Sequence, residues 1–196
     1  SIPQDLKFEG ENTTVQIGDN STIREFVTIS RGTSDKLTTK VGDNCLIMAY
    51  SHLAHDCIIE DYCIIVNSVQ IGGHVHLGEY AIVGGGTLIH QFSKIGAHSM
   101  IAGGSLVRKD VPPFCKAGKE PLSFRGVNSI GLKRRNFSNE QINHIQNIFR
   151  ILYLEGRNNS QAVKKIESDI EDSIEKKTVL DFISDSKRGI IKGLMD

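Results

Sequence analysis

The sequence contains no tryptophan, and aromatic residues make up only 6% of its 196 positions. Any core must therefore be aliphatic and thin. No apolar run approaches the roughly 20 residues that a membrane-spanning helix needs, so we expect no membrane span. Lys+Arg and Asp+Glu balance at 23 each, which argues against a strongly basic nucleic-acid-binding protein.

The four cysteines form no CxxC pair, which argues against a zinc ribbon and a thioredoxin-type redox motif. We interpret them as reduced, buried residues of a cytoplasmic protein. No pattern of a basic segment, an apolar stretch and a cleavage site follows Ser1, so no signal peptide is predicted.

Aliphatic residues recur at every sixth position through the middle of the chain. The step begins at Val41 and continues through Ile47, Leu53, Ile59, Ile65, Ile71, Leu77, Val83, Ile89, Ile95, Ile101 and Val107. The residue four places after each of the first eleven is small or β-branched. Ile17, Ile23 and Ile29 carry the same step earlier in the chain. A period of six fits neither an α-helix nor a simple strand.

Such a period predicts a parallel β-helix, in which each hexapeptide supplies one short strand and one corner, and three hexapeptides complete a coil. A narrow prism of this kind has room for Val, Ile and Leu but little for Trp. We therefore expect a β-helix over residues 1–113, with the polar stretch 30–40 extruded as a loop.

The pattern changes after residue 113, where Pro112 and Pro113 suit the end of a sheet stack. Residues 114–196 are predicted to form a small C-terminal α-helical subdomain. The charge also divides: residues 1–110 carry 8 basic and 12 acidic residues, and residues 111–196 carry 15 and 11. Three helices are expected: one from a capping box at Ser138 to about Glu155, one capped by Asn159 or Ser160, and one over about 178–186.

The repeat predicts which histidines meet, because residues 18 apart stack about 4.8 Å from one another on successive coils. His55 then stacks on Gly73, and Asp56 stacks on His74. One polar corner should collect six side chains from distant positions: His52, His55, Asp56, His74, His90 and Gln91.

Three interpretations of this corner compete. The histidines could decorate a polar surface. They could complete a zinc site, as in the γ-class carbonic anhydrases, which use the same kind of prism. Or one imidazole could act as a general base on an acceptor hydroxyl while a backbone N–H holds the oxyanion. Gly72 and Gly73 would let an acyl carbonyl approach the backbone.

Several short motifs occur in order along the chain. They are Gln4-Asp5-Leu6-Lys7, His52-Leu53-Ala54-His55-Asp56-Cys57, Gly73-His74-Val75, His90-Gln91-Phe92, and Asn128 followed by Gly131-Leu132-Lys133-Arg134-Arg135. Together they resemble the UDP-N-acetylglucosamine O-acyltransferases of lipid A biosynthesis, and the resemblance extends into the helical tail. It implies that the β-helix is left-handed.

The resemblance implies transfer of an R-3-hydroxyacyl chain from acyl carrier protein to the 3-hydroxyl of UDP-N-acetylglucosamine, the first step of lipid A synthesis, with no metal and no cofactor. His55 would be the general base, and Asp56 is a candidate to orient it. The N–H of Gly73 would stabilise the oxyanion.

The resemblance also implies the remaining substrate contacts. Asp5, Lys7, His52, His74, His90 and Gln91 would line the sugar and pantetheine pocket, while Asn128, Arg134 and Arg135 would reach the nucleotide. Gly103 matches a position that limits acyl length, and a glycine there predicts a long chain. The family is a homotrimer with active sites between subunits, and the basic tail would attract the acidic carrier protein.

Some positions depart from the family pattern. Ser30 stands where many relatives have His, and Ile130 stands where an acidic residue is common. Relatives also have further coils before the Gln4-Asp5-Leu6-Lys7 segment. The alternatives to this function are another hexapeptide-repeat acyltransferase or acetyltransferase, a zinc carbonic anhydrase-like enzyme, and a non-catalytic trimeric scaffold.

Overall fold

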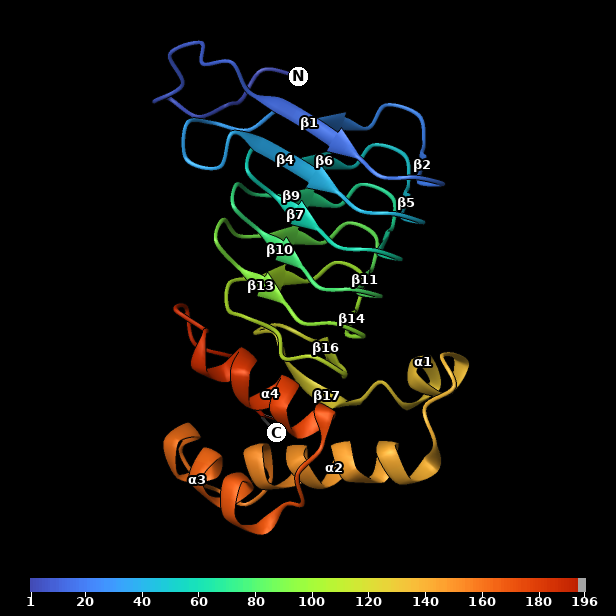
Figure 1. Ribbon diagram of the computed structural model, residues 1–196, viewed down its shortest axis with the longest axis vertical. Coiled ribbons are helices and arrows are strands. Elements are labelled where there is room, and N and C mark those ends of the chain that lie inside the picture. Colours follow the sequence, from blue (N-terminus) through green and yellow to red (C-terminus); the bar gives the residue numbers. More distant parts are fainter. Residues whose placement is uncertain (194–196) are drawn as a thin grey trace.

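The computed structural model describes residues 1–193 and consists of a β-solenoid followed by helices (Figure 1). Nearly every hexapeptide forms one short strand, and the strands of successive coils pair in parallel into three sheets. The parallel β-solenoid that the six-residue period predicts is thereby confirmed.

The three sheets form the three faces of the prism. The first sheet contains β1 (Thr14–Ile17), β4 (Thr38–Val41), β7 (Ile58–Ile59), β10 (His76–Leu77) and β13 (Lys94–Ile95). The second contains β2 (Thr22–Ile23), β5 (Leu46–Ile47), β8 (Ile64–Ile65), β11 (Ile82–Val83), β14 (Met100–Ile101), β16 (Cys115–Gly118) and β17 (Ser123–Val127). The third contains β3 (Thr28–Ile29), β6 (His52–Leu53), β9 (Gln70–Ile71), β12 (Leu88–Ile89) and β15 (Leu106–Val107).

The core of the prism is aliphatic, as its composition requires. All twelve residues of the six-residue step from Val41 to Val107 are buried, and so are the small residues that follow each of them by four places. Three of those small residues are Cys45, Cys57 and Cys63. All four cysteines are buried and unpaired.

The first coil is longer than the later ones. Thr14 pairs with Thr38, a separation of 24 residues, whereas Ile58 pairs with His76, a separation of 18. The chain therefore carries one extra hexapeptide here. The six extra residues fall within an irregular segment, residues 31–37, which we call the inserted loop and which lies within the predicted extruded stretch.

The β-sheet continues beyond Pro113. β16 extends the second sheet in parallel, and β17 returns antiparallel to it, so two strands precede the helices. The six-residue period gives no indication of this pair. The division into domains at residue 113 stays a prediction, and residues 194–196 of the predicted helical subdomain lie outside the described part.

Within residues 1–193, four helices follow: α1 (Ser129–Arg134), α2 (Asn139–Tyr153), α3 (Asn159–Asp169) and α4 (Ile174–Ser184). The capping box at Ser138 is present at the start of α2, as predicted. Asn158 caps α3 in place of the predicted Asn159 or Ser160, and α4 begins earlier than predicted because Ser173 caps it. The helix α1 was not predicted.

Buried side chains join the helices to the end of the prism. Ile145, Ile148 and Phe149 of α2 are buried, and the Phe149 ring stacks on Phe124 of β17 with 5.0 Å between centroids.

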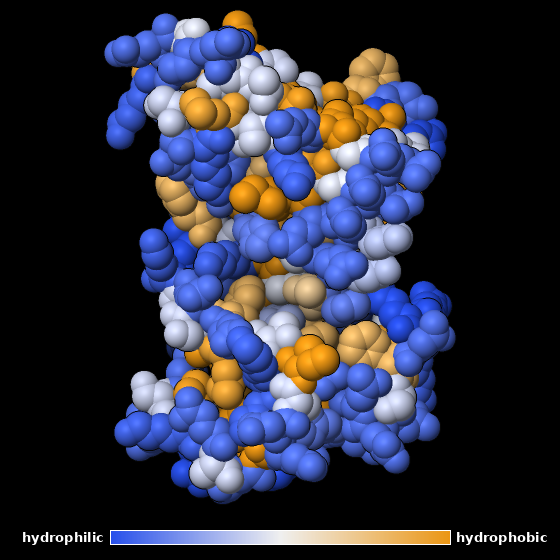
Figure 2. All heavy atoms as spheres, in the orientation of Figure 1, coloured by the Kyte–Doolittle hydropathy of each residue, from blue (hydrophilic) through white to orange (hydrophobic). Residues whose placement is uncertain are grey.

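None of the helices in residues 1–193 combines the length and hydropathy that a bilayer crossing requires. Figure 2 shows hydrophobic atoms on the surface near the first coils, where Ile17 and Ile23 are exposed at the end of the stack.

Candidate active site

The predicted polar corner opens onto a cavity of about 740 Å³ near the first coils. Five of the candidate residues line it: Asp5, Lys7, His55, His74 and Gln91. The other lining residues are Gln4, Leu6, Glu11, Thr33, Ser34, Asp35 and Phe92. The cavity thus joins the N-terminal segment, the inserted loop and three successive coils, which are far apart in the sequence.

The turn that connects the third sheet to the first recurs in successive coils, and its residues stack to form the site. We call this turn, residues 54–56, 72–74 and 90–92, the histidine corner. Asp56, His74 and Phe92 occupy its equivalent positions, each with φ near +60°. The N–H of His74 donates to the carbonyl of His55, and that of Phe92 donates to the carbonyl of Gly73. The His74 ring lies flat on Phe92, with 4.4 Å between centroids. The predicted 18-residue columns are therefore present.

His55 and Asp56 form a hydrogen-bonded pair. The Nδ1 of His55 lies 2.9 Å from the Oδ2 of Asp56, whose side chain is completely buried. Thr33 of the inserted loop donates its N–H to Oδ1 at 2.9 Å and its hydroxyl to Oδ2 at 2.6 Å. Burial raises the pKa of the Asp56 carboxyl, but the hydrogen bonds from Thr33 and His55 outweigh burial and hold this pKa below its usual value. Asp56 is thus an anion that can orient the His55 ring.

The opposite edge of the His55 ring faces the backbone of the next coil. A Cβ built on Gly73 would lie 2.8 Å from the Nε2 of His55. No acceptor among residues 1–193 takes the N–H of Gly73, and Nε2 of His55 has no partner there either. A base and a backbone donor are therefore both available next to the same cavity.

His74 completes this group. Its ring meets that of His55 edge-on, with 5.0 Å between centroids, and its Nδ1 lies 3.2 Å from the Asp35 carboxylate. Burial lowers the pKa of His74, although the carboxylates of Asp56 and Asp35 oppose that change. His74 therefore favours its neutral form near neutral pH.

Two other candidate histidines do not line the cavity. His52 lies on the outer face of the third sheet, where its Nδ1 is 2.7 Å from the Thr28 hydroxyl. His90 is exposed and its Nδ1 is 3.0 Å from the carbonyl of Gln91. Ser30 is buried beneath the N-terminal residue, with its hydroxyl 3.5 Å from that of Ser1.

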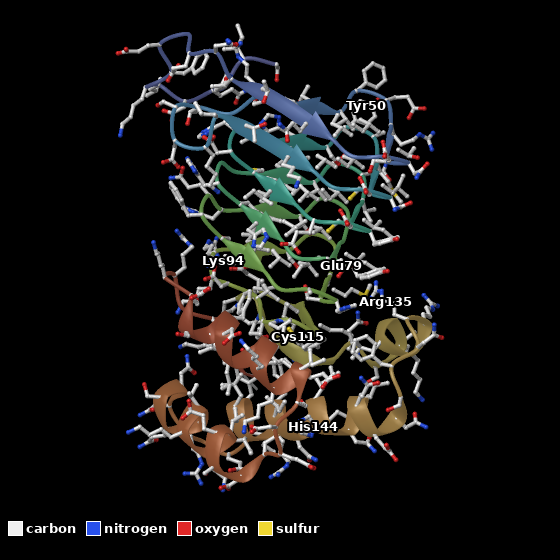
Figure 3. All side chains as sticks on the ribbon, viewed as in Figure 1. Tyr50, Glu79, Lys94, Cys115, Arg135 and His144 are labelled. Carbon is white, nitrogen blue, oxygen red and sulfur yellow. The ribbon has the colours of Figure 1, made fainter. Side chains whose placement is uncertain are left out.

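The three candidate nucleotide-binding residues lie at another corner of the prism. Asn128 caps α1, and its amide donates to the carbonyl of His98. Arg135 donates to the carbonyl of Tyr80 and places its guanidinium 4.8 Å from the centre of that ring; Figure 3 shows Arg135 beside Glu79 at the junction of prism and helices. Arg134 is exposed at the end of α1. None of the three lines the cavity.

This second corner carries a column of aromatic rings, which we call the aromatic corner. Tyr62, Tyr80, His98 and Phe114 stack along it with centroid separations of 4.6 to 5.7 Å. Burial and the neighbouring Arg135 lower the pKa of His98 to about 4. Much of the small aromatic content thus lies outside the prism core.

The inserted loop supplies contacts that the sequence analysis missed. Thr33 and Asp35 were only part of an extruded stretch, and nothing local indicates where such a loop folds back. The usable signal is the longer first coil, since a step of 24 residues from Asp56 leads to Gly32, next to Thr33.

A metal site is the remaining interpretation of the histidine corner. His55, Asp56 and His74 offer ligand atoms within 4.8 Å of one another, the one such group in residues 1–193. Both oxygens of Asp56, however, already accept hydrogen bonds from Thr33, and Oδ2 also contacts His55. The arrangement suits a buried orienting carboxylate better than a metal ligand.

Comparisons with known proteins identify the family. A family model described as UDP-N-acetylglucosamine O-acyltransferase, domain 2, matches residues 110–191, and a bacterial transferase hexapeptide model matches residues 38–73. An acyl-[acyl-carrier-protein]–UDP-N-acetylglucosamine O-acyltransferase of Thermodesulfovibrio yellowstonii is 47% identical over 191 residues, which are 97% of this chain and 74% of that protein. The chain belongs to this O-acyltransferase family.

Other members of this family are also similar to the chain. The O-acyltransferase of Thiobacillus denitrificans is 43% identical over the same shares of the two chains. The crystal structure of a UDP-N-acetylglucosamine acyltransferase from Bacteroides fragilis matches with a TM-score of 0.96 and 48% identity, over 98% of this chain and 75% of that one. The chain therefore spans about three quarters of the length of these family members. The match favours the O-acyltransferase over a zinc carbonic anhydrase-like enzyme, a different hexapeptide-repeat transferase and a non-catalytic scaffold.

Proposed function

We propose that this chain transfers an R-3-hydroxyacyl group from acyl carrier protein to the 3-hydroxyl of UDP-N-acetylglucosamine, the first step of lipid A biosynthesis. Family membership over 97% of the chain supports the reaction. The observation that carries the mechanism is the His55–Asp56 pair facing the backbone of Gly73 beside one cavity.

The reaction proceeds by general-base catalysis. The Nε2 of His55 takes the proton of the sugar hydroxyl, whose oxygen attacks the thioester carbonyl carbon. Asp56 holds Nδ1 and stabilises the imidazolium that forms. The Gly73 N–H donates to the oxyanion. The intermediate then collapses, the carbon–sulfur bond breaks, and the leaving thiolate takes the proton back from His55.

We further propose that the active enzyme is a homotrimer whose sites lie between subunits. In one chain, Arg134 is exposed at the end of α1 and does not line the cavity at the histidine corner. A neighbouring subunit could bring its Arg134 and Arg135 to this cavity, where an arginine fork suits a diphosphate. Light scattering in solution should give three times the chain mass.

A long acyl chain is part of the proposal. Gly104 has φ +69° and is the turn residue of its corner, whereas Gly103 has no backbone conformation that requires glycine. The outer face of the third sheet changes from Thr28, His52 and Gln70 to Leu88 and Leu106. It leads to a cavity of about 230 Å³ lined by Leu106, Pro121, Leu122 and Ile191 together with three basic residues. This apolar face supports a long hydrocarbon groove along the third sheet. Gly103 lies in the turn between β14 of the second sheet and β15 of the third, where we propose that the missing side chain leaves the groove open.

A cytoplasmic location is also proposed, because the four unpaired thiols suit a reducing compartment. The function is tested by incubating the purified chain with R-3-hydroxyacyl carrier protein and UDP-N-acetylglucosamine. We expect O-acylated sugar nucleotide and free carrier-protein thiol in equal amounts, with the same rate after dialysis against EDTA. Absence of the acylated product would overturn the proposal, and a loss of rate with EDTA would favour a metal site.

A further inference from the structure

The inserted loop lies directly against the catalytic pair. It leaves the first coil after Ser30 and returns at β4, and it contains the extra hexapeptide that lengthens this coil. A loop without function could have folded over open solvent. Here it contributes three residues to the wall of the cavity: Thr33, Ser34 and Asp35.

Thr33 is the residue of the loop that is most firmly tied to the site. It is only 6% exposed, and both of its donors point at the Asp56 carboxylate, at 2.9 Å from the N–H and 2.6 Å from the hydroxyl. The hydroxyl donates to Oδ2, which is the same oxygen that contacts His55. The strength of the Thr33 hydrogen bond therefore acts on the oxygen that orients the base.

We propose that Thr33 is a positioning residue, which acts on catalysis through Asp56 by fixing the carboxylate that orients His55. The inference rests on the proposed role of His55 as general base. Thr33 comes from the coil that precedes His55 and Asp56 in the stack. Thr33 contacts Asp56, which in turn contacts His55.

The chemistry of a buried carboxylate explains why this matters. An anion in a low-dielectric site needs donors for its lone pairs, and charged hydrogen bonds are stronger than neutral ones. Without the Thr33 hydroxyl, the negative charge of Asp56 is less neutralised and the carboxylate is freer to rotate. Rotation loosens His55, and the stronger negative charge stabilises the protonated ring.

Other charged groups near the pair must be counted. His74 places its Nε2 3.7 Å from the Oδ2 of Asp56, and Asp35 lies 3.2 Å from the other nitrogen of that ring. Lys36 donates to the Asp56 carbonyl at 3.3 Å. Thr39 accepts a hydrogen bond from the Asp56 N–H at 2.8 Å. None of these groups replaces the hydroxyl hydrogen bond to Oδ2.

The test compares Thr33→Val, which removes the hydroxyl and keeps the shape and the backbone donor, with Thr33→Ser, which keeps the hydroxyl. Thr38→Val is the matched control, because Thr38 lies on β4 nearby and its hydroxyl pairs with that of Thr14. We expect Thr33→Val to lower kcat about tenfold, as loss of one charged hydrogen bond would. The KM for the sugar nucleotide should change less than twofold, and the acid limb of the kcat/KM profile should move to higher pH.

Thr33→Ser should restore most of the rate, and Thr38→Val should match the wild type. An unchanged kcat and acid limb in Thr33→Val would overturn the proposal, and so would equal losses in Thr33→Val and Thr33→Ser. NMR of the Nδ1 proton of His55 in the substrate-free protein gives a second readout, which should move in Thr33→Val alone. If the wild type transfers no acyl group, the proposed function fails, while the NMR comparison still tests the contact.

Discussion

The ring of His55 lies so close to Gly73 that a methyl group on Gly73 would meet it at 2.7 to 2.8 Å. Real Cβ atoms do not approach ring atoms this closely, and the Asp56 contact and the His74 ring leave His55 little room to move. The absence of a side chain at Gly73 is therefore a condition for the position of the His55 ring.

Gly73→Ala should lower kcat by a factor of about 100 or more, because it would displace both the proposed base His55 and the proposed oxyanion donor at residue 73. Steady-state kinetics and a melting curve measure the effect. Gly86→Ser is a suitable control: a side chain there meets open space, and Ser68 already holds the equivalent corner position with φ +60°. Wild-type kcat in Gly73→Ala would contradict the described geometry.

Gly103→Met should shift the preference of the enzyme toward shorter acyl donors if Gly103 borders the acyl groove as proposed, because the side chain would occupy space that glycine leaves open. Competition between short and long hydroxyacyl carrier proteins measures the ratio of kcat/KM values. A Cβ at this position already meets the carbonyl oxygen of Gly85 at 3.0 Å, so Gly103→Ala controls for that contact. We expect Gly103→Ala to keep the long-chain preference. Unchanged selectivity in Gly103→Met would remove Gly103 from the groove.

Arg134 and Arg135 should respond differently to alanine. Arg134 is exposed, so Arg134→Ala should raise the KM for UDP-N-acetylglucosamine without changing the melting temperature. Arg135 packs on Tyr80 and donates to its carbonyl, so Arg135→Ala should also lower the melting temperature. Substrate titration and calorimetry separate the two effects. A normal KM in both variants would argue against a nucleotide role for this segment.

His98 should make the stability of the fold depend on pH. Its pKa is about 4 in the folded protein, below the ordinary 6.5, so the unfolded chain binds its proton first as the pH falls. The contribution is complete above pH 6.5 and is lost as the pH falls toward 4. Allowing for partial exposure, it is about 2 kcal/mol. Urea unfolding across this range measures it.

His98→Phe removes this titration and continues the aromatic stack between Tyr80 and Phe114. Its unfolding free energy should therefore fall less between pH 6.5 and 4 than that of the wild type. Equal losses in the two proteins would show that other groups cause the pH dependence.

The six-residue step predicted the coils because it reports which side chains point inward. Every aliphatic residue from Val41 to Val107 that the step selects is buried. The 18-residue length of a coil also predicted that His55 lies next to Gly73 and Asp56 next to His74, since stacking depends only on the length of a coil. The inserted hexapeptide lengthens the first coil to 24 residues, so the 18-residue step did not predict Thr33 and Asp35 at the site.

Local sequence signals predicted the helices less completely than the six-residue step predicted the coils. The capping box at Ser138 fixed the start of α2, because both reciprocal hydrogen bonds lie within four residues. The β16–β17 pair and α1 depend on contacts with the last coil and with His98, which no local pattern encodes. The aromatic corner was not predicted, although Tyr62, Tyr80 and His98 are 18 residues apart and the same step would have placed them in one column. Only Phe114, 16 residues after His98, departs from that step.

The proposed mechanism depends on His55 as the general base for acyl transfer to the sugar hydroxyl. The most direct measurement is the single-turnover rate of His55→Ala with saturating R-3-hydroxyacyl carrier protein and UDP-N-acetylglucosamine, beside His76→Ala, whose ring pairs with Glu60 on the first sheet. If His55 is this base, His55→Ala should lose at least about 1,000-fold in rate with both substrates still bound, and His76→Ala should keep a normal rate. A rate for His55→Ala within tenfold of the wild type would contradict it.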